Sequence, residues 1–159
     1  MLLSGLQRHY RPAALPQVGE GQLPLDNMVC VGMQWDIDRH AATMAAHALR
    51  LHGVDSSTRA VSIDTVLREG DLALYDGVRN LCICSFHPNP IGKLSQICES
   101  LHQRCPQLRI TVMLLGGSPG RAPLRAETLD GMQADNAVYQ ISGLTALVVE
   151  QRPLDPDAD

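Results

Sequence analysis

The sequence MVCVGM at residues 28–33, followed by a polar loop and an Ala-rich run over residues 38–51, decides the fold. The first stretch is short and continuously apolar, which is typical of a β-strand covered on both faces. The Ala-rich run reads as a helix, and Gly53 stands where the C′ residue of a helix is expected. A buried strand followed by a helix is the repeating unit of α/β proteins with a parallel sheet.

The same pattern recurs along the chain. Further strands are predicted at residues 59–63, 81–85, 108–115 and 137–139. Helices are predicted after a cap at Asp64 and over residues 91–105, about 121–132 and 142–150. Five such units predict an α/β protein with a five-stranded parallel sheet and helices on both of its faces.

The composition of the chain changes at its two ends. Residues 1–26 are rich in proline and glycine and show no sustained periodicity, so we expect a flexible lead-in. Residues 27–151 form the predicted folded domain, and residues 152–159 an acidic tail.

Composition and charge narrow the function classes. The 159 residues are 45% hydrophobic and 19% charged, with a net charge of −4, as in a soluble globular protein. The acidity and scarce aromatic residues disfavour nucleic acid as a partner, and no apolar run is long enough for a membrane span. We do not expect a secretory signal, because Leu2 and Leu3 are not followed by an extended apolar region, and the odd number of cysteines has no metal-binding spacing. We therefore expect a cytoplasmic protein with reduced thiols that fill the core.

Candidate ligand-binding residues follow the strands, because open parallel sheets bind ligands at the carboxyl ends of their strands. They are Asp38, His40, Thr43, Ser85, His87, Gly116 and Gly117. Each has a structural interpretation as well. Asp38 is a good helix N-cap, and an isolated His40 is more often solvated than a ligand. Ser85 can bond local backbone, the glycines can form a tight turn, and the nearby Trp35 is either a packed hydrophobe or a lid over a ligand.

The spacing of these residues resembles the signature of the cobalamin (vitamin B12)-binding-like domain superfamily. Asp38-x-His40-x-x-Thr43 is followed after 41 residues by Ser85-x-His87, and 28 residues later by Gly116-Gly117. The resemblance covers roughly residues 28–150. It implies a flavodoxin-like (Rossmann-like) three-layer sandwich of the cobalamin-binding-domain type, with a cobalamin cofactor.

The resemblance also implies a role for each residue. His40 would be the lower axial ligand of cobalt, in place of the cofactor's own base (the base-off/His-on arrangement). Asp38 would accept a hydrogen bond from the other imidazole nitrogen, and Ser85 would bond Asp38 in turn. Gly116 and Gly117 would leave room for the nucleotide tail.

Two positions depart from the family pattern. Thr43 replaces the family's glycine, so a branched side chain stands where the tail is threaded. His87 replaces its leucine, which puts a polar ring in the pocket wall. The axial-ligand residues are kept, and part of the tail pocket is altered.

A second resemblance rests on the strand at 81–85, on LHQRCP at residues 101–106 and on the strand RITV at residues 109–112. These segments are similar to the C-terminal cytosolic domain of some autoinducer-2-exporter-family membrane proteins. That domain is a relative of the cobalamin-binding fold without the histidine ligand, and its implied role is regulatory or scaffolding.

Two functional hypotheses follow. The first is a non-catalytic cobalamin-binding or cobalamin-sensing module that holds cobalt through His40. The alternative is a cofactor-free regulatory or interaction domain of the same fold, as the cytosolic part of a membrane transporter would be. A corrinoid or a partner protein is the expected binding partner, and a homodimer is a further expectation. We do not expect an enzyme, because cobalamin enzymes usually carry catalysis in another domain and 159 residues leave no room for one.

Overall fold

The computed structural model of the chain describes residues 27–117 and 123–150. Within these ranges the strands form one parallel sheet in the order β2-β1-β3-β4-β5. The strands are β1 (Asn27–Gly32), β2 (Asp55–Thr58), β3 (Asn80–Ser85), β4 (Arg109–Leu114) and β5 (Asn136–Val138). The helices are α2 (Asp36–Leu51), α3 (Ile63–Glu69), the 3-10 helix η1 (Leu72–Tyr75), α4 (Ile91–Arg104), α5 (Ala126–Met132) and α6 (Ile141–Glu150). The predicted lead-in 1–26, the tail 152–159 and residues 121 and 122 of the helix expected at about 121–132 lie outside the described residues. That helix begins later than predicted, since residues 123–125 are not helical and α5 starts at Ala126.

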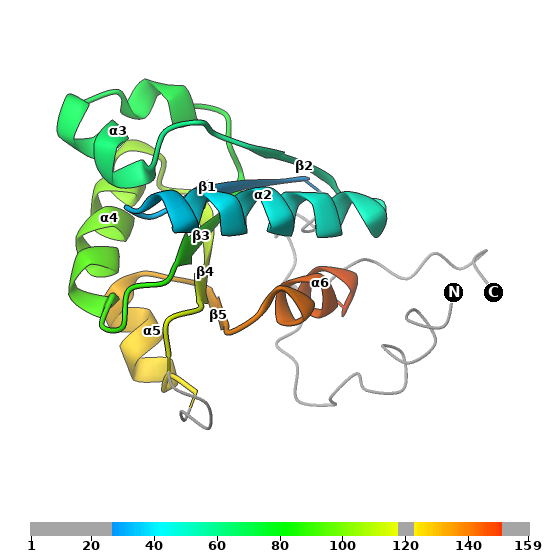
Figure 1. Cartoon of the computed structure of the whole chain (residues 1–159). Coiled ribbons are helices and arrows are strands. Elements are labelled where there is room, and N and C mark those ends of the chain that lie inside the picture. Colours follow the sequence, from blue (N-terminus) through cyan, green and yellow to red (C-terminus); the bar gives the residue numbers. More distant parts are fainter. Residues whose placement is uncertain (1–26, 118–122, 151–159) are drawn as a thin grey trace.

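Helices cover both faces of the sheet, and Figure 1 shows α3, α4 and α5 together at one side of it. Residues of α3, α4 and α5 pack with Val29, Val31 and Ile83 in one core. Residues of α2 and α6 pack with Met28 and Cys82 in a second core on the opposite face. The alternation along β1 sends successive side chains to the two cores. The predicted flavodoxin-like three-layer α/β fold is therefore confirmed.

No helix among the described residues is long and apolar enough to cross a bilayer.

The buried cysteines pack as small apolar side chains, as predicted. Cys30 lies opposite Cys82 in the register of β1 and β3, and both are completely buried beneath α2. A hydrogen bond to Cys82, together with burial, raises the pKa of the Cys30 thiol far above its usual range. Burial raises the pKa of Cys98, on the other face, to about 12. These thiols stay protonated at neutral pH, so they are not activated nucleophiles.

One predicted strand is wrong. The expected strand at residues 59–63 is replaced by β2 at Asp55–Thr58, four residues upstream, where it pairs with residues 27–30 of β1. β2 is an edge strand, and its Ser56 hydroxyl donates a hydrogen bond of 2.6 Å to the Ala46 carbonyl of α2. A polar sequence can therefore form this strand, whereas Ile63 is needed in α3 to fill the core.

Two predicted caps are also wrong. Ser62, and not Asp64, is the N-cap of α3, because its hydroxyl accepts a hydrogen bond from the Thr65 amide. Asp38 is not the N-cap of α2, which begins at Asp36 after Trp35. The predicted C′ glycine is confirmed, since Gly53 follows the C-cap of α2 with a φ of 79°.

The chain leaves β1 toward β2 in one direction and continues from β3 to β5 in the other. The carboxyl ends of β1 and β3 are therefore the switch point of the sheet, where ligands of such folds bind. Gly32 at the end of β1 lets the first turn of α2 approach closely. A Cβ atom at Gly32 would lie 2.6 Å from the Arg39 amide nitrogen and 2.9 Å from the Asp38 carbonyl carbon.

This close approach predicts the effect of a methyl group at Gly32. Gly32→Ala should lower the free energy of unfolding by about 1–3 kcal/mol, because the clash is with backbone that cannot turn aside. Gly92→Ala is the matched control, since a Cβ atom there meets nothing within 4 Å and alanine favours the helix. Urea unfolding followed by circular dichroism measures both, and equal stabilities of the two variants would contradict the packing described for Gly32.

Candidate functional site

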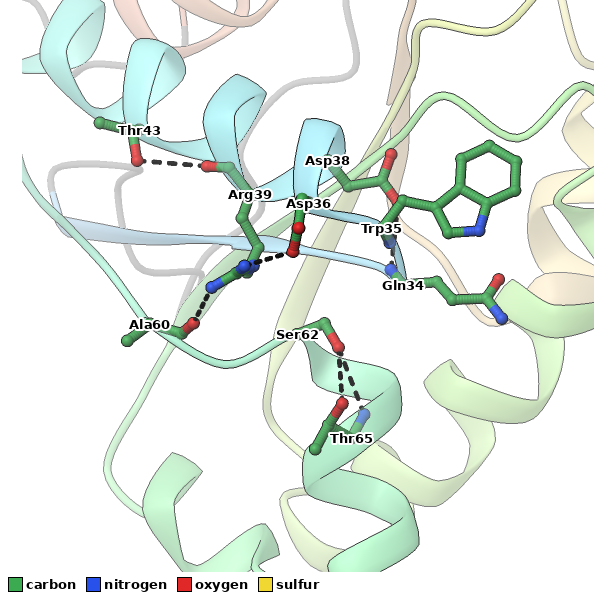
Figure 2. A network of polar contacts seen from close by, with 9 residues as sticks. All are labelled: Gln34, Trp35, Asp36, Asp38, Arg39, Thr43, Ala60, Ser62 and Thr65. Carbon is green, nitrogen blue, oxygen red and sulfur yellow. Dashed lines mark hydrogen bonds and ion pairs between the residues drawn. The ribbon is translucent and has the colours of Figure 1, made fainter.

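The carboxylate of Asp38 joins the ends of β1 and β3. Its Oδ2 accepts hydrogen bonds from the amides of Gln34 (3.0 Å) and Trp35 (2.9 Å), in the loop after β1. Its Oδ1 accepts a third, from the amide of Phe86 (2.7 Å), just after β3. The Asp38 side chain is completely buried, and Figure 2 shows it turned toward Gln34 and Trp35. Asp38 is the third residue of α2, and its side chain caps the helix by accepting a hydrogen bond from the Trp35 amide. The same side chain also holds the chain just after β3, through the Phe86 amide.

His40 lies on the other side of the same helix. Successive residues of an α-helix are turned by about 100°, so Asp38 and His40 are separated by about 200°. Asp38 is buried and His40 is exposed. The structure therefore does not bring the predicted axial ligand to its predicted carboxylate partner.

Thr43 is exposed one turn further along α2. Its hydroxyl donates a hydrogen bond of 3.1 Å to the Arg39 carbonyl, as threonines in helices commonly do. Arg39 in turn pairs with Asp36 and donates a hydrogen bond of 2.6 Å to the Ala60 carbonyl, so this flank of α2 is tied to the chain after β2 (Figure 2).

Ser85 and His87 are engaged with local backbone. The buried Ser85 hydroxyl accepts a hydrogen bond of 3.1 Å from the His87 amide. The Nδ1 atom of His87 accepts one of 2.9 Å from the Asn89 amide, so the hydrogen of the neutral ring is on Nε2. The predicted Ser85–Asp38 hydrogen bond is replaced by the bond from the Phe86 amide to Asp38.

Trp35 and His87 stack on each other across the switch point. Their ring centroids are 5.3 Å apart, with planes inclined by 25°. Trp35 comes from the loop after β1 and His87 from the loop after β3, so the stack covers the same two strand ends that Asp38 joins. The indole is still 42% exposed. The interpretation of Trp35 as a packed residue fits this contact, although its outer surface faces solvent.

Position 116 has room only for a glycine, because the backbone of the loop after β3 packs directly against it. A Cβ atom at this position would lie 2.1 Å from the Phe86 carbonyl oxygen and 2.7 Å from that of His87. The loop after β3 thus rests directly on the loop after β4. The space that the resemblance assigns to a nucleotide tail is filled at Gly116 by this backbone, while Gly117 is exposed.

An ion pair at the same edge was missed by the sequence reasoning. The Asp64 carboxylate is buried and lies 2.7 Å from the Lys93 ammonium and 3.4 Å from the Arg68 guanidinium. Lys93 is in the first turn of α4, where the helix dipole disfavours a cation, and Asp64 offsets this cost. The available signal was the position of both residues at the start of helices that follow β2 and β3, the two strands on either side of β1. The sequence reasoning assigned Asp64 to a cap instead.

These residues do not fit a His-ligated corrinoid as they are arranged. The carboxylate that should orient the imidazole holds three backbone amides, the imidazole is on the opposite side of the helix, and the Gly116 contact fills part of the tail space. Among the described residues, no group of three or more His, Cys, Asp or Glu side chains could hold a metal ion.

Surface hollows of about 900, 600 and 420 Å³, all lined by described residues, lie away from this edge. They are lined by segments at the opposite, amino-terminal edge of the sheet, such as residues 76–79, which precede β3.

No protein-family model matches the sequence, and no curated protein is significantly similar to it.

The role of Asp38 predicts a large effect of a small substitution. Asp38→Asn should lower the free energy of unfolding by about 2–3 kcal/mol, because one charged acceptor oxygen is replaced by an amide group that faces N–H donors. Asp36→Asn, two residues earlier and exposed, should cost much less. Chemical unfolding of both variants measures the difference, and an Asp38→Asn protein as stable as the parent would contradict the assigned role.

Proposed function

We propose that this domain is a non-catalytic interaction or regulatory module that works without a corrinoid. The observation that carries the proposal is the Asp38 carboxylate, whose three amide hydrogen bonds hold the two strand ends together. A carboxylate used in this way stabilises the loops of the domain. Releasing it to orient a ligated histidine would leave three amides at the switch point without their acceptor.

The other polar groups at this edge support the same function. Ser85 and His87 have backbone partners, and Asp64 is paired with Lys93 and Arg68. A catalytic site needs groups directed at a substrate position, with a nucleophile or a base among them. The polar groups described here instead fix the loops over which a partner protein would bind.

The outer surface near the switch point is suited to protein contacts. Trp35 is 42% exposed and Ile37 is 49% exposed, and they lie at the beginning of α2. Exposed aromatic and aliphatic side chains on rigid elements are typical of interaction surfaces. The similarity to the cytosolic domain of exporter-family membrane proteins supports an attached or partner membrane protein as the target of regulation.

The cobalamin-binding hypothesis is the second candidate. One observation favours it: His40 is exposed in the second turn of α2, the helix that follows the carboxyl end of β1. Ligation with Asp38 as the orienting carboxylate would require this part of α2 to rearrange. The two proposed functions therefore make different predictions for the first two turns of α2. These turns stay helical in a cofactor-free domain, and they rearrange when a cobalamin-binding domain takes up a corrinoid.

A visible absorption titration with hydroxocobalamin separates them. The parent protein, His40→Ala and His47→Ala are each mixed with the corrinoid and desalted. We expect no retained colour and no band shift in any of the three proteins, because the parent lacks an oriented cobalt ligand.

His47→Ala is the matched control, because His47 is exposed on the same helix and reports nonspecific coordination by a surface imidazole. Colour retained by the parent and by His47→Ala, but lost in His40→Ala, would overturn the cofactor-free proposal in favour of a cobalamin site. Circular dichroism of the three proteins verifies that they are folded.

A further inference from the structure

The solvent face of α2 carries a regular apolar stripe. Ile37, Met44 and Leu51 follow one another at intervals of seven residues, and they are 49%, 60% and 65% exposed. His40 and His47, also exposed, lie between them. At about 100° per residue these five side chains fall within about one quarter of the helix circumference. We call this set the α2 stripe.

The α2 stripe is not the face that holds the helix on the sheet. That task belongs to a separate row of buried side chains, which consists of Asp38, Ala41, Ala42, Ala45, Ala46 and Leu49. On the flank of α2 next to the stripe, Arg39 and Arg50 donate hydrogen bonds to the carbonyls of Ala60 and of Ser56 in the edge strand β2. Among residues 27–117 and 123–150, the stripe therefore takes no part in the two buried cores, yet it exposes three large apolar side chains in a line.

The order of residues in the stripe is the same from both ends. It reads apolar, histidine, apolar, histidine, apolar, with Met44 at the centre. If a second copy of the helix lies antiparallel across the stripe, Ile37 of each copy meets Leu51 of the other, and Met44 meets Met44. An isologous contact of this kind needs a self-complementary surface, and this stripe provides one.

The charges beside the stripe favour the same arrangement. Asp36 stands at the beginning of α2 and Arg50 near its end, on the same flank of the helix. A two-fold axis near Met44 places Asp36 of each copy on the same side of the contact as Arg50 of the other, whereas a parallel arrangement sets each residue level with its own copy and offers no opposite charge. Within one copy, Asp36 pairs with Arg39 and Arg50 donates to the Ser56 carbonyl, and both side chains are exposed. The Arg39 guanidinium beside Asp36 lowers the pKa of that carboxyl, so Asp36 remains charged.

We propose that the chain forms a two-fold symmetric dimer in which the α2 stripes of two copies pack antiparallel about Met44. From Ile37 to Leu51 the stripe extends over 15 residues of helix, or about 21 Å at 1.5 Å per residue. A contact of this length is at the small end of specific interfaces, so the dimer should be weak, with a dissociation constant on the order of 10 μM. This proposal goes beyond the proposed function and does not depend on it, because dimerisation is measured without any cofactor.

Sedimentation equilibrium of the full chain, from about 1 μM to about 500 μM, tests the proposal. The parent should change from monomer to dimer across this range. Met44→Glu should raise the dissociation constant at least tenfold, because it places two carboxylates against each other on the axis. Leu74→Glu is the matched control: Leu74 is also 60% exposed but lies on η1, and the substitution should leave the dissociation constant unchanged.

Charge reversal tests the antiparallel register. Asp36→Arg and Arg50→Asp should each weaken the dimer, because each brings like charges together across the axis. The protein carrying both substitutions should recover most of the parent's affinity. Circular dichroism shows that each variant is folded before its sedimentation is interpreted.

Three results would overturn the proposal. The first is a parent that stays monomeric over the whole range. The second is a dimer that Met44→Glu weakens no more than Leu74→Glu does. The third is a double charge reversal that is no better than the two single ones, which would rule out the antiparallel register.

Discussion

The carboxylate of Asp38 is the interaction on which the carboxyl edge of the sheet depends. Through three amides it fixes the loop after β1, the beginning of α2 and the first residue after β3. A buried charge is costly unless hydrogen bonds compensate it, and here each oxygen has at least one amide donor. The Trp35–His87 stack and the contact of the Phe86 carbonyl with Gly116 lie on the segments that this carboxylate positions.

The same carboxylate relates the fold to its function. In the arrangement implied by the cobalamin resemblance, an aspartate at this position orients a histidine. In this structure it orients backbone, and the histidine two residues later faces solvent. The side chain cannot serve both purposes in this conformation, because Asp38 is buried and the imidazole of His40 lies on the other, exposed side of α2. In the function that we propose, the switch point is a rigid base and the exposed side chains of α2 are the surface offered to partners.

The sequence was sufficient to predict the sheet, because residues 28–33 and 81–84 are continuously apolar. Successive side chains of a strand point to opposite faces, so such strands must be covered on both faces. It was insufficient for β2, since an edge strand needs little apolar surface and Ser56 is held by a hydrogen bond to Ala46. Sequence spacing placed Asp38, Ser85 and Gly116 at one edge. It could not reveal that their partners are backbone groups of Phe86 and His87, because residue identity carries no signal for those contacts. The Asp64–Lys93 pair was missed for a related reason, since it depends on how α3 and α4 meet.

Amide hydrogen exchange at Gln34, Trp35 and Phe86, measured by NMR with and without hydroxocobalamin, tests the central claim most directly. These amides donate to Asp38, so the account predicts that they are protected from exchange and that the corrinoid leaves their protection unchanged. Fast exchange at all three amides in the protein alone would contradict the assigned role of Asp38. Protection that is lost when the corrinoid is added would show instead that Asp38 leaves these amides to support a bound cofactor.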